Sequence, residues 1–185
     1  MAQALIASED QYVLYDLQKH AIVETIASSK KKAVLPTLID ISHDDLYTIE
    51  SSGHQAIHLR NLKTKQLLAK YEGHLYAVHN ISFAQHSYVF VSSANSECLL
   101  WNPREQLNAV TMTEVSQPEK ILDMASSEII TSLSIKEIVG DNTYMAAVTT
   151  ESSTTIFITR TNAGGKASVQ KNKVVKKESQ IKVQG

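Results

Sequence analysis

The stretch GHLYAVHNISFAQHSYVFVSSANSECLLWN, residues 73 to 102, contains the only tryptophan of the chain, Trp101. This tryptophan stands 28 positions after Gly73, and an asparagine follows it. Two apolar runs rich in β-branched and aromatic residues, YVFVSS and CLLWN, lie on either side of the polar segment ANSE. The pattern predicts two antiparallel strands joined by a turn.

The same plan of strand, turn and strand occurs in three other windows, at residues 4–16, 45–61 and 143–159. Two of these hairpins and the quoted stretch end at Asp16, Asn61 and Asn102, at intervals of 45 and 41 residues. Further strand candidates lie between the hairpins, among them residues 107–113. A period of about 40 to 45 residues with four strands in each unit is typical of propeller blades. The sequence therefore predicts an all-β fold.

The quoted stretch also matches a known repeat in its details. Gly73-His74 stands at its start, an apolar strand follows, and Trp101-Asn102 closes it. In these features it resembles a WD repeat, with Trp-Asn in place of the family's Trp-Asp. The resemblance implies a WD-repeat β-propeller portion of about four blades over residues 1–161. We expect this portion to be the C-terminal part of a larger propeller, or a partner to close it.

The resemblance further implies a buried hydrogen-bonded network within this unit. In the WD family the network joins a His, a Ser or Thr, an Asp and the Trp. The matching positions here are His74, Ser92 or Ser93, Asn95 and Trp101. Since the amide of Asn95 cannot act as a charge-assisted acceptor, we expect a structural network that is weaker than in a typical repeat.

Length and composition limit the other possibilities. A chain of 185 residues with 43% hydrophobic content can bury the core of one ordinary domain. The single Cys98 allows no disulfide framework within the chain and favours a reducing compartment. The N-terminal MAQALIASED lacks a basic start, and no apolar run approaches the roughly 20 residues of a membrane span. We therefore expect a soluble protein with no membrane partner.

The charges divide the chain unevenly. Residues 1–161 carry 12 basic and 18 acidic side chains, whereas residues 162–185 carry 6 lysines and only Glu178. We expect residues 162–185 to form a Lys-rich flexible tail. Its lysines could neutralise phosphates of RNA or contact a partner protein, with no aromatic residue among them to stack on bases. These lysines are Lys166, Lys171, Lys173, Lys176, Lys177 and Lys182.

A closer resemblance rests on the order of three segments. The run KTKQLLAKYEGHLYAVHNISF, the hairpin YVFVSSANSECLLWN, and MAAVTTESSTTIFI followed by the lysine-rich end resemble the later blades of one ribosome-biogenesis family. This is the U-three-snoRNA-associated protein five family, called WD-repeat protein forty-three in animals, and the similarity covers roughly residues 55–185.

This family resemblance implies a function. It implies a noncatalytic, nucleolar scaffold of the small-subunit processome, which assembles on the 5′ external transcribed spacer of nascent pre-rRNA and supports 18S rRNA maturation. The implied partners are other WD-repeat and helical subunits, with pre-rRNA contacted through the basic tail. The same fold would also suit an adaptor elsewhere, such as a ubiquitin-ligase substrate receptor or a coat subunit.

No pattern in the sequence points to catalysis or to a metal. No Gly-x-Ser-x-Gly elbow is present, and Cys98 precedes an apolar run in which a thiol packs as a small hydrophobe. His54 and His58 are four residues apart across a turn and a strand, not on a helix, and zinc requires three or four converging ligands. We therefore expect no catalytic residue, no metal, no cofactor and no small-molecule substrate.

Overall fold

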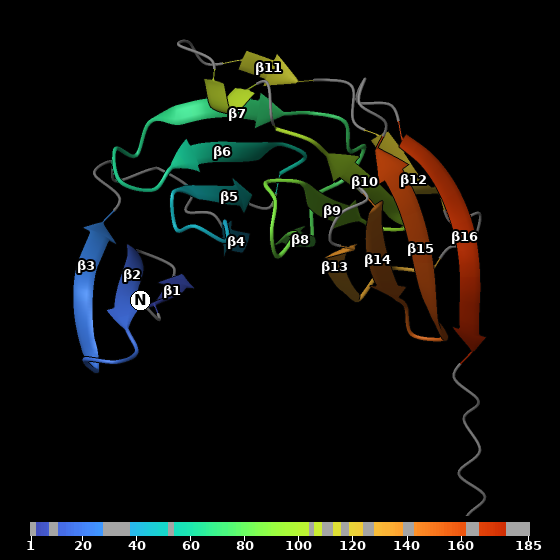
Figure 1. Cartoon of the computed structure of the whole chain (residues 1–185), viewed down its shortest axis with the longest axis horizontal. Helices are drawn as coiled ribbons and strands as arrows, with labels where there is room; N and C mark the ends of the chain where they lie inside the picture. Colours follow the sequence, from blue (N-terminus) through green and yellow to red (C-terminus); the bar gives the residue numbers. More distant parts are fainter. Residues whose placement is uncertain are drawn as a thin grey trace, which may run out of the picture.

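A computed structural model describes most of the chain as β-strands in four sheets. The described residues are 3–7, 11–27, 38–51, 54–103, 106–108, 113–115, 119–123, 128–138, 143–161 and 167–176. The four sheets follow one another around an arch, which Figure 1 shows with its two ends apart. None of the described helical residues forms a helix long and apolar enough to cross a membrane. The predicted all-β propeller fold is confirmed, as an open arch.

Each sheet is named here by its place along the chain. The first sheet holds β1 (Gln3–Ala7), β2 (Gln11–Asp16) and β3 (Ala21–Ala27). The second holds β4 (Leu38–Ile41), β5 (Tyr47–Ser51), β6 (Ile57–Asn61), β7 (Leu67–Tyr71) and β11 (Thr113–Val115).

The remaining two sheets complete the arch. The third holds β8 (Asn80–Phe83), β9 (Phe90–Ala94), β10 (Glu97–Trp101) and β12 (Glu119–Asp123). The fourth holds β13 (Ser132–Ile138), β14 (Thr143–Thr149), β15 (Ser153–Thr161) and β16 (Ala167–Lys176). A short 3-10 helix, η1 (Gln106–Asn108), follows β10.

The strands of each sheet pair in sequence order from the inside of the arch to the outside. In Figure 1, β4, β8 and β13 lie on the concave side, and each begins its sheet. These inner strands contact one another from sheet to sheet, β4 with β8 and β8 with β13, while β1 contacts β4. This radial order of antiparallel strands is the arrangement of blades in a propeller.

Two apolar cores fill the spaces between neighbouring sheets. Strands β9 and β10 are buried on both faces, and both sides of the pleat carry apolar side chains beside the buried Ser92 and Ser93. Phe90 and Trp101 pack on the second sheet, whereas Val91 and Leu100 pack on the fourth. The third sheet is thus the best buried blade, which explains why its sequence shows the clearest repeat.

The repeat predicted from Asp16 and Asn61 corresponds to two turns with the same hydrogen bonds. Asp16 ends β2, and its Oδ1 accepts hydrogen bonds from the backbone N–H groups of Gln18 and Lys19. Asn61 ends β6, and its Oδ1 accepts from Lys63 and Thr64 in the same way. Four residues after each capping side chain, the backbone has a positive φ, at His20 (51°) and at Lys65 (60°).

One expectation about the strands is wrong. The fourth strand of the third sheet is β12, not a strand at residues 107–113. The chain between β10 and β12 instead crosses to the second sheet, where β11 pairs in parallel with β7. Leu107 of η1 packs against the core between the second and third sheets, which explains why this segment turns back.

The expected flexible tail is also not flexible throughout. Ala167–Lys176 form β16, which pairs with the whole length of β15 in antiparallel register. A register shift places Lys173 opposite Ile156 and Lys171 opposite Phe157. The segment contains Val169, Val174 and Val175, and β-branched residues favour strands even where lysines are frequent. The rest of the predicted tail, residues 162–166 and 177–185, lies outside the described residues.

Candidate functional site

A buried hydrogen-bonded network joins three segments of the third sheet. His74 lies in the segment between β7 and β8, Ser92 is on β9, and Trp101 is on β10. The Nε1–H of Trp101 donates to Ser92 Oγ at 2.7 Å, and His74 Nε2 lies 2.6 Å from the same oxygen. His74 Nδ1 lies 2.8 Å from Glu97 Oε2. All three segments are therefore fixed through one hydroxyl.

The surroundings of His74 determine where its proton lies. A carboxylate only accepts, so Nδ1–H donates to Glu97, and the Ser92 hydroxyl donates to Nε2. Burial lowers the pKa of His74, and the hydrogen bond and charge of Glu97 oppose this shift. A neutral imidazole with its proton on Nδ1 satisfies every hydrogen bond of the network.

The acid of the network is Glu97, which the sequence analysis did not identify. Asn95, the expected member, lies in the turn between β9 and β10 with a φ of 48°, a conformation that asparagine tolerates. Its carbonyl accepts the N–H of Ile130 at 2.8 Å, a contact with the segment that leads to the fourth sheet. The sequence feature that could have indicated Glu97 is its position as the charged first residue of the buried strand ECLLW.

Of the two candidate serines, only Ser92 joins the network. Ser92 and Ser93 are neighbours on β9, so their side chains point to opposite faces of the sheet. Ser93 Oγ accepts a hydrogen bond from Asn80 Nδ2 at 3.0 Å, which links β9 to the inner strand β8. The structure therefore brings together His74, Ser92 and Trp101, and places Ser93 and Asn95 elsewhere.

The order Glu97, His74, Ser92 is that of the acid, base and nucleophile of a hydrolase triad. The Ser92 hydroxyl, however, is fully buried, and its oxygen already accepts from Trp101. A substrate carbonyl cannot reach this oxygen without displacing the core. Burial also raises the pKa of the Cys98 thiol to about 12, so this thiol is not an activated nucleophile.

The candidate metal ligands are dispersed. His54 lies in the turn after β5 and His58 on β6, where burial lowers its pKa. Within the described part of the chain, no three His, Cys, Asp or Glu side chains converge as metal ligands would. These histidines therefore belong to the loops and faces of the blades.

The junctions between sheets repeat the same contacts. The N–H of Val78 donates to the carbonyl of His54 at 3.1 Å, and the N–H of Ile130 donates to that of Asn95 at 2.8 Å. Each bond joins the segment before an inner strand to the hairpin turn of the preceding sheet. The segments that these bonds hold in place expose large apolar side chains, namely Leu75 (72%), Tyr76 (56%) and Ile129 (56%).

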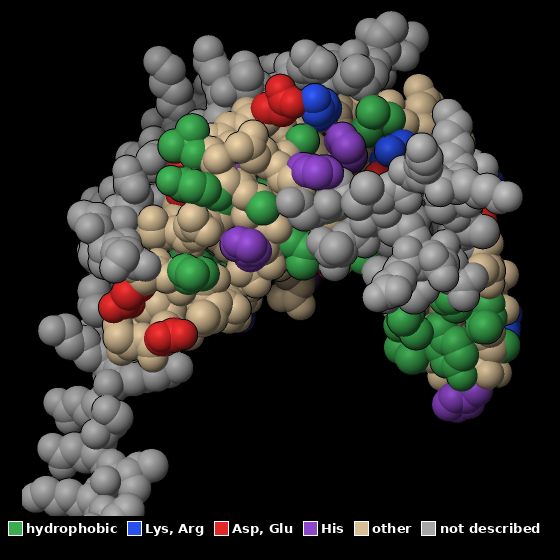
Figure 2. Space-filling model, turned by 180° about the vertical axis from the view of Figure 1, so that it is seen from behind, with side chains coloured by type: hydrophobic (Ala, Val, Ile, Leu, Met, Phe, Trp, Pro, Cys, Tyr) green, Lys and Arg blue, Asp and Glu red, His purple; other side chains and the backbone are tan. Residues whose placement is uncertain are grey.

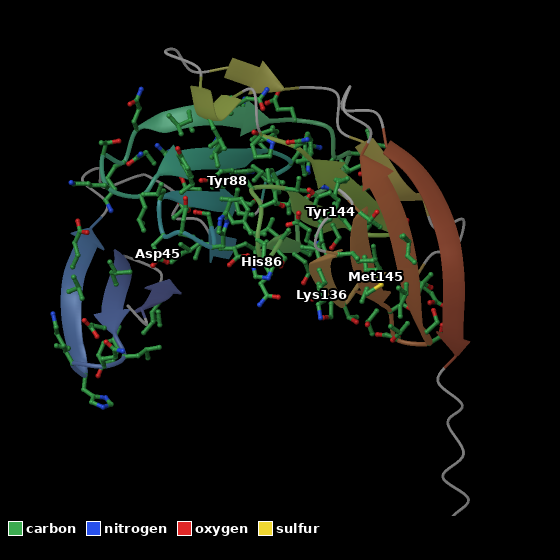
Figure 3. All side chains as sticks on the ribbon, viewed as in Figure 1. Asp45, His86, Tyr88, Lys136, Tyr144 and Met145 are labelled. Atoms are coloured by element: carbon green, nitrogen blue, oxygen red, sulfur yellow. The ribbon has the colours of Figure 1, made fainter. Side chains whose placement is uncertain are left out.

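A second set of junction contacts lies at the loops between the first and second strands of the sheets. The Tyr88 hydroxyl donates to Asp44 Oδ2 at 2.6 Å, and the Tyr88 ring contacts Tyr47 edge-on. At the next junction, Ser87 lies 3.5 Å from the Tyr144 hydroxyl. Figure 3 labels Tyr88 and Tyr144, which come from the third and fourth sheets. Neighbouring blades are thus joined by polar contacts as well as by their cores.

The candidate phosphate-binding lysines fall into two groups. Lys171, Lys173 and Lys176 belong to β16, the outermost strand of the fourth sheet. Lys166, Lys177 and Lys182 lie outside the described residues. The structure therefore places half of the basic cluster on a blade edge, where a backbone strand fixes the spacing of the lysines.

Comparison with known proteins supports the fold. No protein-family model and no curated protein matches the chain. The crystal structure of the RRP9 WD40 repeats is similar to this chain, with a TM-score of 0.59 and 14% sequence identity. The alignment covers 92% of this chain and 48% of the RRP9 chain. The structure of U3-55K is also similar, with a TM-score of 0.59 and 13% sequence identity, and the alignment covers 94% of this chain and 50% of the U3-55K chain.

Sequence identities this low show that the chains share a fold, and nothing more specific. The chain spans about half the length of both solved structures. Its own residues agree with the comparison, since the third sheet carries the buried His-Ser-Trp network of a WD blade. The chain therefore has the fold of a WD40 β-propeller, present as a partial propeller whose described sheets do not close a ring.

Proposed function

We propose that this chain is a noncatalytic scaffold subunit in ribosome biogenesis, acting in assembly of the small-subunit processome on nascent pre-rRNA. The observation that carries the proposal is the likeness to the RRP9 WD40 repeats and to U3-55K over nearly the whole chain. The name U3-55K contains the U3 that also names the family whose later blades this sequence resembles. The proposed location is the nucleolus.

The geometry supports a scaffold. The hydrogen bonds among Glu97, His74 and Ser92 lie inside the third sheet, where they connect its strands. The exposed apolar side chains Leu75, Tyr76 and Ile129 instead lie on two successive junctions of the arch, which suits contact with protein subunits. The proposed partners are other WD-repeat and helical subunits of the complex.

The proposed contact with pre-rRNA involves the lysines of β16 and of the residues around it. Lys171, Lys173 and Lys176 lie on β16, the edge strand of the fourth sheet, where a nucleic acid could approach them. Binding of this kind depends on salt and not on base sequence, because it releases counterions. The 5′ external transcribed spacer would then be selected by the neighbouring subunits.

Affinity purification of the tagged protein from its own cells, at low salt, tests the proposal. Bound proteins are identified by mass spectrometry and bound RNA by sequencing, from one sample. We expect other WD-repeat processome subunits together with 5′ external transcribed spacer RNA. Recovery of ubiquitin-ligase or coat subunits without pre-rRNA would retain the propeller and reject the function.

A further inference from the structure

Large apolar side chains are exposed on one rim of the arch, where the segments that lead into β8 and β13 meet the turns between the second and third strands of the sheets. Leu75 is 72% exposed, and Tyr76 and Ile129 are each 56% exposed. In Figure 2, which shows the arch from behind, hydrophobic side chains lie beside acidic and histidine side chains on the visible face. We call this surface the junction rim, and it consists of residues 54–56, 72–79, 95–97, 128–131 and 150–152.

The backbone that carries Leu75 and Tyr76 is fixed on both sides. His74, directly before them, is buried in the hydrogen-bonded network of the third sheet. Val78, shortly after them, is buried, and its N–H donates to the turn after β5. The Leu75 carbonyl itself accepts a hydrogen bond of 2.7 Å from Gln55 Nε2. A partner that covers these two side chains therefore loses little binding free energy to the ordering of this chain.

Ile129 is held in the same way at the next junction. Ile130, directly after it, is buried, and its N–H donates to the turn between β9 and β10. Glu128, directly before it, accepts hydrogen bonds of 2.6 Å from the hydroxyls of Ser152 and Thr150. These hydrogen bonds lower the pKa of Glu128, so its carboxylate is charged beside the exposed isoleucine at neutral pH.

The charged residues of the junction rim are acidic. Its segments contain no Lys or Arg and four glutamates, which are Glu72, Glu97, Glu128 and Glu151. The neighbouring strand β7 supplies one cation, since Lys70 pairs with Glu72. Acidic side chains attract a positively charged partner and repel the phosphates of a nucleic acid. The charge of the junction rim therefore favours a basic protein segment over RNA.

We propose that the junction rim binds a segment of a partner protein in which apolar residues alternate with lysine or arginine. The apolar residues of the segment cover Leu75, Tyr76 and Ile129, and its cations lie beside the glutamates. Stacked sheets lie about 10 Å apart and an extended chain rises about 3.3 Å per residue, so about three residues reach from one junction to the next. The inference rests on the proposed scaffold role for the existence of a protein partner, and it names the chemistry of that partner.

Fluorescence anisotropy with the complete 185-residue chain and a labelled peptide tests the proposal. The probe repeats Leu-Lys-Ser over about 15 residues, so its leucines recur at the expected spacing of the junctions. Two matched peptides replace every lysine by glutamate or every leucine by serine. We expect the probe to bind at least about 10-fold more tightly than either matched peptide. Equal binding of the probe and the glutamate peptide would overturn the proposal.

Substitutions locate the binding surface. Leu75→Ser should weaken binding of the probe about 10-fold, whereas Leu46→Ser, at a 50% exposed leucine between β4 and β5 on the opposite rim, should leave it unchanged. Glu151→Gln should weaken it about 2- to 5-fold. Gln18→Lys changes the net charge by the same amount at the turn after β2 and should have no effect. Equal losses for the two leucine variants would also overturn the proposal.

The fold of the variants and the source of a failure can both be checked. Trp101 fluorescence establishes that the leucine variants are folded, because neither leucine packs in the cores. Probe binding that requires Leu75, with no processome subunit recovered from cells, would support the junction rim and reject the ribosomal role. Processome subunits recovered equally with the Leu75→Ser chain, without probe binding, would reject the junction rim alone.

Discussion

Ser92 Oγ accepts a hydrogen bond of 2.7 Å from the indole N–H of Trp101, and both residues are buried in the third sheet. The same serine also meets His74 at 2.6 Å, so its hydrogen-bonding capacity is used by the protein itself. This relationship joins β9 to β10 and to the segment before β8. It makes the third sheet a fixed unit on which the neighbouring blades pack.

Ser92→Ala should destabilise the chain by about 2 to 4 kcal/mol. The change leaves the Trp101 N–H and the His74 Nε2 buried without a partner, and each such group costs about 1 to 3 kcal/mol. Urea unfolding followed by Trp101 fluorescence measures this, since the chain has one tryptophan. Ser82→Ala, at a half-buried serine with only a 3.4 Å contact to Phe83 O, is the control and should cost under about 1 kcal/mol. Equal losses for the two variants would disprove the network's role.

The free energy of unfolding should decrease as the pH falls below about 6.5. Burial lowers the pKa of both His74 and His58 in the folded chain. The unfolded chain therefore binds protons at a higher pH than the folded chain, and stability is lost as the pH falls from 6.5 towards the folded pKa values. Urea midpoints at about pH 7.5 and 5.5 measure the effect.

Two histidine variants distinguish the source of this pH dependence. His58→Gln should reduce the dependence of the free energy of unfolding on pH, because the half-buried imidazole is removed. His20→Gln should leave it unchanged, because His20 is exposed. A wild type that becomes more stable between neutral pH and pH 5.5 would contradict the assignment.

Asn61→Ala should cost about 1 to 2 kcal/mol, as loss of a capping side chain does. It removes the acceptor of the Lys63 and Thr64 N–H groups. Asn61→Asp should retain most of the stability, because Asp16 makes the same two contacts at the equivalent turn. Thermal unfolding of the two variants compares them, and an aspartate variant as unstable as the alanine variant would show that the two turns are not equivalent.

His20→Gly should stabilise the chain by up to about 1 kcal/mol. His20 has a φ of 51°, where glycine has no steric cost, although glycine loses more entropy on folding. Gln18→Gly, at an exposed residue of the same turn without a positive φ, should destabilise it instead. Melting temperatures of the two variants measure the difference, and a fall for both would exclude strain at His20.

Much of the fold could be predicted from local patterns. The hairpins ending at Asp16, Asn61 and Asn102 were visible because apolar, β-branched runs and the polar turn residues between them are local patterns. His74 and Trp101 were recognisable because the third sheet is buried on both faces and retains the residues of a WD unit. The other sheets carry weaker patterns, since one of their faces is exposed or polar.

What the sequence did not reveal depends on contacts between distant segments. Glu97, the first residue of β10, contacts His74 across 23 positions of sequence, whereas Asn95 lies in the turn and its backbone carbonyl accepts the N–H of Ile130. The parallel pairing of β11 with β7 joins residues more than 40 positions apart, and no local pattern specifies it. The strand β16 was hidden because its lysines suggested solvent, while its pairing with β15 stabilises it.

Ultraviolet cross-linking of the tagged protein to RNA in cells, followed by sequencing, tests whether this propeller assembles on nascent pre-rRNA. We expect cross-links concentrated in the 5′ external transcribed spacer of pre-rRNA. They should be strongly reduced when Lys171, Lys173 and Lys176 are changed to glutamine, with other processome subunits still bound. Cross-links spread over unrelated RNA, or none above an untagged control, would contradict a scaffold that assembles on nascent pre-rRNA.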